Sequence, residues 1–367
     1  MIPFVNLAAQ RRAYHEELAE AEARVLDSGT YIGGPEVKAL EDDLAAYTGV
    51  SNVVTCSSGT DAIMLSLMAL GLNPGDEVIV PDFTFISPAE CVCRLGGVPR
   101  FADICKEGFL IDPSAVEGLI TERTVGIIAV HLFGQCAQME WLRLLAQAHG
   151  LWLMGDAAQA FGATREGRQA VSLADVSITS FYPTKPLGSY GDGGAIFTEN
   201  AELAATMRRL AHHGMRSRYY HEFIGLNSRL DAIQAAVLRV KLRHLSDELE
   251  RRRKNAAKYD KFFSKFEGIT TPVVERSNVS TFSQYTLRAS DRFTWLSLCE
   301  KAEVPTSIYY PRILSWQPSL APFTPPSKNR MAAHACHEVF SIPVCAFTDI
   351  DKIIDDLGRA AKETFQG

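Results

Sequence analysis

The sequence predicts an α/β fold, with a mostly parallel seven-stranded sheet sandwiched by helices and a smaller C-terminal α+β domain. Over the first two thirds of the chain, seven short apolar or β-branched runs alternate with helical patterns. These runs are continuously apolar, which is typical of strands covered on both faces. A chain of 367 residues with 47% hydrophobic content is long enough for about two domains.

The predicted strands all belong to the first 200 residues. In chain order they are VVTCS at 53, EVIVPDF at 77, VPRFAD at 98, VGIIAVH at 125, LWLMGDA at 151, VSITSFY at 176 and GGAIFTE at 193. In sheets of this kind, ligands bind at the carboxyl ends of the strands. A functional site is therefore expected at that edge.

The remainder of the chain predicts a long helix and a second domain. Residues 228–266 are charged but place apolar residues three or four apart, which indicates one helix leaving the large domain. We place the domains at 1–240 and 241–367. Three strands and two helices are predicted in the second domain: ITTPVV, SQYTLRA and PTSIYYP as strands, FTWLSLCEKA and DIDKIIDDLGRAAKETF as helices. The proline-rich stretch 320–329 predicts an exposed loop.

Charge and cysteine content argue against several classes of function. The net charge is only -6 and both signs are mixed along the chain, so no nucleic-acid partner is expected. We expect no membrane partner and a cytoplasmic location, because no basic and apolar leader and no window of about 20 uncharged apolar residues stands out. The eight cysteines form no CxxC pair and predict reduced, structural thiols. We expect no metal site, since HACH at 334–337 has no second Cys/His cluster at zinc spacing.

One lysine stands in an unusual setting, in SFYPTKPLGSYGDGGAIFTEN at 180–200. Lys185 follows a predicted strand and precedes a glycine-rich turn, where the backbone can approach a ligand closely. Most lysines are solvated surface charges, but a lysine in a confined site can lose its proton and become a nucleophilic amine. Such an amine forms a Schiff base with the aldehyde of pyridoxal phosphate.

Three further features match what that cofactor needs. Asp156 ends an apolar strand and could keep the pyridine nitrogen protonated, or could simply cap the following segment. Ser58, Gly59 and Thr60 open an amphipathic helix, which suits a phosphate but is also an ordinary helix start. Aromatic residues at 83 and 85 follow another strand end, where aromatic side chains are usually core. The coincidence of all four features at strand ends favours the cofactor.

With these residues in view, the chain resembles the DegT/DnrJ/EryC1/StrS sugar aminotransferases, which have the aspartate aminotransferase (type I) fold. The resemblance extends from about residue 5 to the C-terminus. The stretches that carry it are SGTYIGGPEVKALEDDLAAYTG, SSGTDAIMLSLMALGLNPGDEVIVPDFTF, HLFGQCAQM, GDAAQAFGA, SFYPTKPLGSYGDGGAIFTEN and YYHEFIGLNSRLDAIQAA.

The resemblance implies a role for each site residue. It makes Lys185 the Schiff-base lysine and Asp156 the partner of the ring nitrogen. The other implied cofactor contacts are Phe85 stacked on the ring, Gln159 at its hydroxyl, Gly59, Thr60 and Ser180 at the phosphate, and Asn227 reaching the phosphate from a partner subunit. The implied substrate contacts are Tyr31, Arg229, Tyr309 and Tyr310. Arg216, Arg218 and Arg229 could hold a pyrophosphate or a uronate carboxylate, or could simply face solvent.

The same resemblance implies the reaction and the assembly. We expect glutamate to donate an amino group to a keto group of a nucleotide-linked sugar, in a homodimer with shared active sites. The stretch GMRSRYYHEFIGLNSRLDAIQAA is more similar to the 3-keto branch, such as enzymes acting on UDP-3-keto-N-acetylglucosaminuronate, than to the 4-keto-6-deoxy branch.

Some alternatives stay open at this point. Many relatives read YPxPLHxQ where this chain has YYPRILSWQ, which leaves the sugar specificity open. Relatives that are dehydratases carry histidine at the lysine position, and Lys185 argues against that chemistry. A lyase similar to cysteine desulfurases, and a regulator that binds a sugar nucleotide or the cofactor without catalysis, are the remaining alternatives.

Overall fold

The large sheet has the predicted seven strands. The computed structural model describes residues 2–365. In spatial order the sheet is β1-β9-β8-β5-β4-β2-β3. The strand bounds are β1 Asn52–Cys56, β2 Glu77–Pro81, β3 Val98–Ala102, β4 Thr124–Val130, β5 Trp152–Asp156, β8 Val176–Ser180 and β9 Gly194–Thr198. β9 runs antiparallel to both of its neighbours and the other strands are mutually parallel, which confirms the prediction of a mostly parallel sheet.

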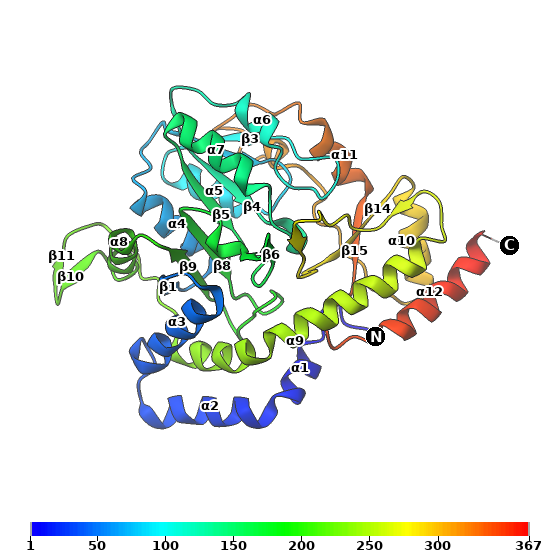
Figure 1. Cartoon of the computed structure of the whole chain (residues 1–367), viewed down its shortest axis with the longest axis horizontal. Helices are drawn as coiled ribbons and strands as arrows, with labels where there is room; N and C mark the ends of the chain where they lie inside the picture. Colours follow the sequence, from blue (N-terminus) through cyan, green and yellow to red (C-terminus); the bar gives the residue numbers. More distant parts are fainter. Residues whose placement is uncertain (1, 366–367) are drawn as a thin grey trace.

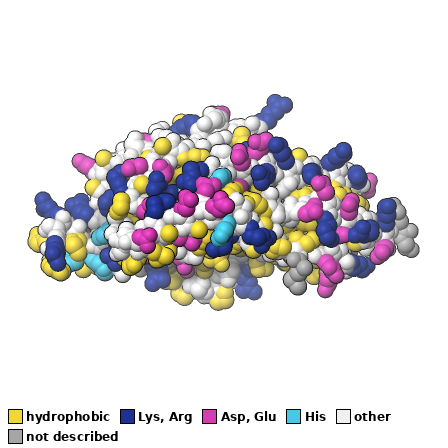
Figure 2. All heavy atoms as spheres, turned by 90° about the horizontal axis from the view of Figure 1, so that it is seen from below, with side chains coloured by type: hydrophobic (Ala, Val, Ile, Leu, Met, Phe, Trp, Pro, Cys, Tyr) yellow, Lys and Arg dark blue, Asp and Glu magenta, His cyan; other side chains and the backbone are white. Residues whose placement is uncertain are grey.

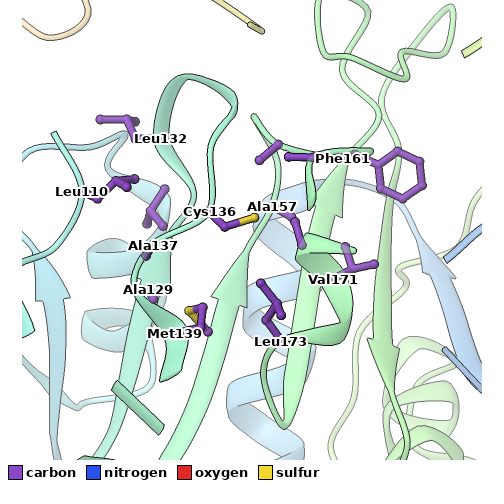
Figure 3. Close-up of a cluster of buried hydrophobic side chains, with 14 of the residues drawn as sticks. Leu110, Ala129, Leu132, Cys136, Ala137, Met139, Ala157, Phe161, Val171 and Leu173 are labelled. Atoms are coloured by element: carbon purple, nitrogen blue, oxygen red, sulfur yellow. The ribbon is translucent and has the colours of Figure 1, made fainter. Parts of the chain in front are cut away.

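Helices cover both faces of this sheet (Figure 1). Their bounds are α3 Gly34–Thr48, α4 Gly59–Ala69, α5 Ser87–Arg94, α6 Pro113–Glu117, α7 Met139–His149 and α8 Ala201–Ala211, with 3-10 turns η1 Leu132–Gly134 and η2 Ala170–Ser172. Alternate residues of one strand enter different cores: Ile79 belongs to one apolar cluster, and Val78 and Val80 to the other. This two-sided burial explains the continuous apolar runs of the sequence. Figure 3 shows part of the first cluster, around Cys136 and Phe161.

A 32-residue helix, α9 Ala232–Phe263, links the two core regions. The N-terminal helices α1 Leu7–Ala13 and α2 His15–Ser28 lie along its first half (Figure 1). Leu18 and Val25 pack there against Val240. The second half of α9 contributes to another core through Tyr259 and Phe263. The predicted helix over 228–266 is confirmed, whereas the domain boundary at 240 falls inside it and stays a prediction.

The C-terminal region has its own small antiparallel sheet, in the order β12-β14-β15. The bounds here are β12 Ile269–Thr270, β14 Tyr285–Ala289, β15 Val339–Ile342, α10 Arg292–Lys301, η3 Leu314–Trp316, α11 Arg330–Glu338 and α12 Ile350–Phe365. The two predicted helices and the strand over SQYTLRA are confirmed. Residues 320–329 contain neither helix nor strand, as predicted. Strands of two or three residues complete the fold: β6 Thr164–Arg165, β7 Arg168–Gln169 and β13 Asn278–Val279 form one sheet, and β10 Met215–Ser217 pairs with β11 Tyr220–His221.

Some expectations for this region are wrong. PTSIYYP forms no strand, because only Ser307 makes an isolated bridge, to Ser341, and the prolines at both ends of the stretch lack an N–H to pair. ITTPVV pairs over its first two residues only, ending before Pro272. Two further elements were not predicted: β15 and the helix before it, α11, which carries HACH.

Among residues 2–365, no helix is long and apolar enough to cross a membrane. Within the same range, no three His, Cys, Asp or Glu side chains come together as a metal site. All eight cysteines are free thiols and seven of them are buried.

Candidate active site

The carboxyl edge of the large sheet gathers most of the predicted cofactor residues. Asp156 is the last residue of β5 and Ser180 the last of β8. Lys185 follows β8, and the turn from β1 into α4 holds Gly59. Since these strands run in the same direction, their ends meet at one edge. Tertiary structure therefore brings together residues that lie far apart in the sequence.

Asp156 and Lys185 form the electrostatic centre of this edge. The Asp156 side chain is 6% exposed and accepts a hydrogen bond from the Ala158 N–H at 2.9 Å. Burial raises the pKa of Asp156, while the Ala158 hydrogen bond and the charge of Lys185 act in the opposite direction. Burial likewise lowers the pKa of Lys185, against the charge of Asp156. A protonated ring nitrogen would give the buried carboxylate the cation that such a group needs.

Glycines let three backbone segments meet at the start of α4. A Cβ on Gly59 would lie 2.7 Å from the Cβ of Ser180, and one on Gly194 would lie 2.4 Å from the carbonyl oxygen of Ser58. Ser58 caps the helix by accepting the Asp61 N–H at 3.0 Å. The N–H groups of Gly59 and Thr60 lie in the first turn, where backbone donors have no partner within the helix. This cradle fits the phosphate of the predicted cofactor.

We expect Gly59→Ala to weaken cofactor binding by at least about 10-fold, because the added methyl group forces the cradle and Ser180 apart. Titration of the apoprotein with pyridoxal phosphate, followed by absorbance, measures the change. Gly118→Ala is a matched control, since Gly118 has an ordinary φ of -67° and its added Cβ would meet its nearest neighbour at 3.8 Å. Equal affinities for both variants would show that the phosphate lies elsewhere.

Gln159 and two aromatic residues, Phe85 and Tyr310, also lie at this edge. The Gln159 Oε1 atom accepts the Phe133 N–H at 2.9 Å, and its Nε2 atom donates to the Tyr310 hydroxyl at 3.1 Å. The Phe85 and Tyr310 rings lie 6.5 Å apart between centroids. Phe85 is 55% exposed, whereas Phe83 is 1% exposed and belongs to the core. Phe85 is thus the aromatic side chain with a face open to a ligand.

Other predicted residues lie in a neighbouring hollow of the same chain. Asn227 is exposed and lines this hollow together with Ser57 and Arg229. Tyr31 is 53% exposed and precedes Ile32, which lines the same hollow. Because Ser57 directly precedes the cradle at Ser58 and Gly59, the hollow adjoins that cradle.

Three other predicted substrate residues, Arg216, Arg218 and Tyr309, do not line this hollow. Arg216 and Arg218 are on the β10–β11 hairpin, Arg216 3.6 Å from Glu222 and Arg218 over the Tyr219 ring. The Tyr309 ring packs edge-on against Phe4, with 6.2 Å between centroids, and also lies next to Tyr310.

Lys241, a buried residue of α9 that was not predicted from the sequence, supports the loop that carries Lys185. Its Nζ atom donates to the carbonyl oxygen of Gly188 at 2.7 Å and lies 4.1 Å from the centre of the Tyr190 ring. The signal was available, because Lys241 stands on the apolar stripe that includes Leu238 and Leu245.

Lys241 predicts a pH dependence of stability. Burial lowers the pKa of Lys241 from 10.5 to about 8, against the opposing charge of Glu248. Between these values the unfolded chain binds more protons, so the cost of burying the charged lysine falls as the pH rises. Relative to Lys241→Met, the wild type should gain about 1 kcal/mol of unfolding free energy per pH unit above pH 8. Urea unfolding of both proteins at pH 7.5, 8.5 and 9.5 tests this, and a constant difference would contradict it.

Comparison with known proteins agrees with this geometry. The model of the DegT/DnrJ/EryC1/StrS aminotransferase family matches residues 12–357. The chain is 42% identical over 353 residues to a UDP-2-acetamido-2-deoxy-3-oxo-D-glucuronate aminotransferase of Pseudomonas aeruginosa, covering 96% of this chain and 98% of the relative. It is also 42% identical over 322 residues to a "pleiotropic regulatory protein" of Geobacillus stearothermophilus, covering 87% of each chain.

A solved structure matches the whole fold. The crystal structure of S. venezuelae DesV in complex with a ketimine intermediate superposes with a TM-score of 0.95 at 37% identity, covering 99% of this chain and 98% of that one. With the family match over nearly the whole sequence, the chain belongs to the DegT/DnrJ/EryC1/StrS aminotransferase family, whose members depend on pyridoxal phosphate.

Proposed function

We propose that the protein transfers the amino group of glutamate to a keto group of a nucleotide-linked sugar. The observation that carries the proposal is the placement of a partly buried Lys185 within the electrostatic reach of buried Asp156, beside the cradle at Gly59. A lysine whose pKa is lowered by burial can act as a nucleophile and as a proton carrier. Pyridoxal phosphate, the cofactor of the family, needs such a lysine for its Schiff base and a carboxylate beside its ring nitrogen.

The cofactor residues divide the work of binding and orientation. When bound, pyridoxal phosphate supplies an electron sink for bonds at the carbon that carries the amino group. The N–H groups of Gly59 and Thr60 would hold its phosphate at the start of α4. Asp156 would hold a proton on the ring nitrogen, and the open face of Phe85 would pack against the ring. Together these contacts fix the ring relative to Lys185.

Lys185 would move the protons of the reaction. Its Nζ atom, once free, would take a proton from the substrate carbon that carries the amino group and pass it to the former aldehyde carbon of the cofactor, on the other side of the shared nitrogen. A lowered pKa favours this role, because the amine must be neutral to accept a proton near pH 7. Glutamate would enter first and leave as 2-oxoglutarate, and the keto sugar would then receive the amino group.

The sugar is proposed to be a UDP-linked 3-keto uronate. The support comes from the Pseudomonas relative, whose name specifies a 3-oxo-glucuronate substrate, and from the resemblance of residues 214–236 to the 3-keto branch. A uronate carboxylate needs a cation, and Arg229, in the hollow beside the phosphate cradle, is the candidate. Cytoplasmic nucleotide sugars would supply such a substrate.

One assay tests the function and separates the alternatives. Purified protein, glutamate and a panel of UDP- and dTDP-linked 3-keto and 4-keto sugars are mixed, and 2-oxoglutarate and the aminated sugar are quantified. We expect the UDP-linked 3-keto uronate to give a kcat/KM at least about 10-fold above that of the neutral sugar that has a hydroxymethyl group in place of the carboxylate. Preference for 4-keto sugars would overturn the sugar assignment. Cofactor binding with no turnover on any sugar would favour a regulator, the role named for the Geobacillus relative.

A homodimer with shared active sites is part of the proposal. The β10–β11 hairpin extends from the body at one end of the molecule (Figure 1). Tyr219 and Ile224 are 78% and 92% exposed there, and Tyr31 and Ile32 are also more than half exposed. Figure 2 shows hydrophobic and basic side chains together at this end. Large exposed apolar side chains of this kind favour contact with another chain, and Asn227 follows the hairpin.

Subunit complementation tests the shared site. Lys185→Ala and Asn227→Asp chains should each be inactive, the second because a carboxylate against the cofactor phosphate repels it. After subunit exchange, a 1:1 mixture should recover up to about a quarter of wild-type activity, because half of the dimers are mixed and each has one intact site. Exchange confirmed by mass spectrometry, with no recovered activity, would mean that each chain builds its own site.

A further inference from the structure

A buried carboxylate outside the predicted cofactor residues holds two loops together at the sheet edge. Asp82 directly follows β2 and its side chain is fully buried. It accepts hydrogen bonds from the Ser315 N–H at 2.7 Å, the Ser315 hydroxyl at 2.9 Å and the Asn329 side-chain amide at 2.9 Å, and also from the Ser327 hydroxyl. Its backbone carbonyl oxygen accepts the Leu314 N–H at 2.8 Å.

Neutral hydrogen-bond donors satisfy the buried carboxylate of Asp82. Every hydrogen-bond donor that residues 2–365 present to Asp82 is neutral. Burial raises the pKa of Asp82 and these donors act in the opposite direction. A buried carboxylate is expensive unless its oxygens are saturated with donors. All of its donors come from one segment, residues 314–329, so the carboxylate fixes that segment to the end of β2.

The segment enters the active site immediately before this attachment. Tyr310 lies four residues before Leu314, and its hydroxyl accepts the Gln159 amide at 3.1 Å. The Tyr310 ring lies 6.0 Å from that of Phe83, which is next to Asp82, and 6.5 Å from that of Phe85. The charge of Asp156 contributes to a raised pKa of Tyr310, so the tyrosine lies within its electrostatic reach.

Both sides of the Asp82 contact therefore carry a site residue. The loop after β2 carries Phe85, and Tyr310 lies four residues before the segment bonded to Asp82. We propose that Asp82 is a positioning residue for the sugar substrate: through Ser315 it sets where Tyr310 stands relative to Phe85 and Gln159. The inference rests on the proposed function in taking Tyr310 as a contact of the sugar.

The chain offers a matched control in Asp103, which follows β3. Its carboxylate accepts the Met331 N–H at 3.1 Å and the Ala332 N–H at 2.8 Å, at the start of α11. Asp103 thus holds the start of α11, which follows the segment bonded to Asp82. Its hydrogen bonds do not involve Leu314 or Ser315. Asp103→Asn should loosen α11 without moving Tyr310.

Hydrogen exchange of the apoprotein tests the attachment without activity. Asp82→Asn replaces one carboxylate oxygen by an NH₂ group, which cannot accept. This group would face donors that now bond to the carboxylate. We expect amides in 309–317 to exchange at least about 10-fold faster in Asp82→Asn, and to be unchanged in Asp103→Asn. Unchanged exchange in Asp82→Asn would overturn the proposal. If Asp82→Asn does not fold, Ser315→Ala removes the hydroxyl donor alone and should give the same change at smaller size.

Separate half-reactions test the positioning role. Asp82→Asn should slow the sugar half-reaction by about 10-fold or more and the glutamate half-reaction by less than about 3-fold. Combined with Tyr310→Phe, its effect on the sugar half-reaction should be strongly non-additive, because both changes act through Tyr310. Equal losses in both half-reactions, or full additivity, would reduce Asp82 to a structural contact. A wild type that aminates no sugar would instead contradict the proposed function, and the exchange comparison would then decide on the attachment.

Discussion

Lys185→Ala should abolish transamination, with a loss of at least about 10⁴-fold in turnover, because one side chain supplies both the covalent attachment and the proton transfer. Purified wild type should absorb at roughly 400–430 nm, and borohydride should fix the cofactor to the peptide that contains Lys185. The variant should lose the fixed cofactor. Lys185→Arg is the matched control, since it keeps a cation at this position but cannot form the bond.

Peptide mapping decides the assignment of that lysine. Lys241 is a second buried lysine with a lowered pKa, and it contacts the loop that contains Lys185. The borohydride product should therefore be located by mass spectrometry rather than inferred from loss of activity. A cofactor fixed to Lys241, or to any lysine other than Lys185, would end the assignment.

Asp156→Asn should slow the half-reaction with glutamate by about 10³-fold while the protein stays folded and still binds some cofactor. The asparagine keeps an oxygen that can accept the Ala158 N–H, so the substitution removes the charge and leaves the local cap. Without that charge the ring nitrogen would lose its proton and the cofactor its capacity to accept electrons. Rapid mixing of the holoenzyme with glutamate, followed by absorbance, gives the rate.

Asp156→Ser separates the two interpretations of this residue. Serine can cap the segment at Ala158 but carries no charge. If Asp156 were only a cap, both variants would transaminate at the wild-type rate. We expect both to be slow, with thermal stability close to that of the wild type for Asp156→Asn.

Most of the large sheet could be predicted because burial on both faces requires continuous apolar runs in the sequence. The ends of these runs mark the strand ends, so Asp156, Lys185 and the turn at Gly59 could be assigned to one edge. It does not say which side chain faces a ligand: Phe83 and Phe85 read alike in the sequence, yet one is buried and the other is 55% exposed. Both rings lie near Tyr310, but Phe83 also packs against Phe109 and Phe133, which come from other parts of the chain.

The strands of the C-terminal region were harder to predict from the sequence. Its strands β12 and β15 are two and four residues long, too short for a clear period. The tyrosines of PTSIYYP have high strand propensity, but neither enters a ladder: Tyr310 packs at the candidate active site and Tyr309 packs against Phe4. Asp82 could not be recognised for another reason, since its partner Ser315 is 233 residues away in the sequence.

The continuity of α9 restricts how this protein can be recombined with its relatives. One face of the helix holds Lys241 against the loop that carries Lys185, and five to six turns later the helix places Tyr259 and Phe263 in the C-terminal core. Inserting a single residue between them would rotate that core by about 100° relative to the active site, whereas seven residues, about two turns, would nearly restore the facing. Chimeras that exchange the C-terminal region, which carries Tyr310, should therefore be joined in the loop after Phe263, where a change in length leaves the helical phase intact.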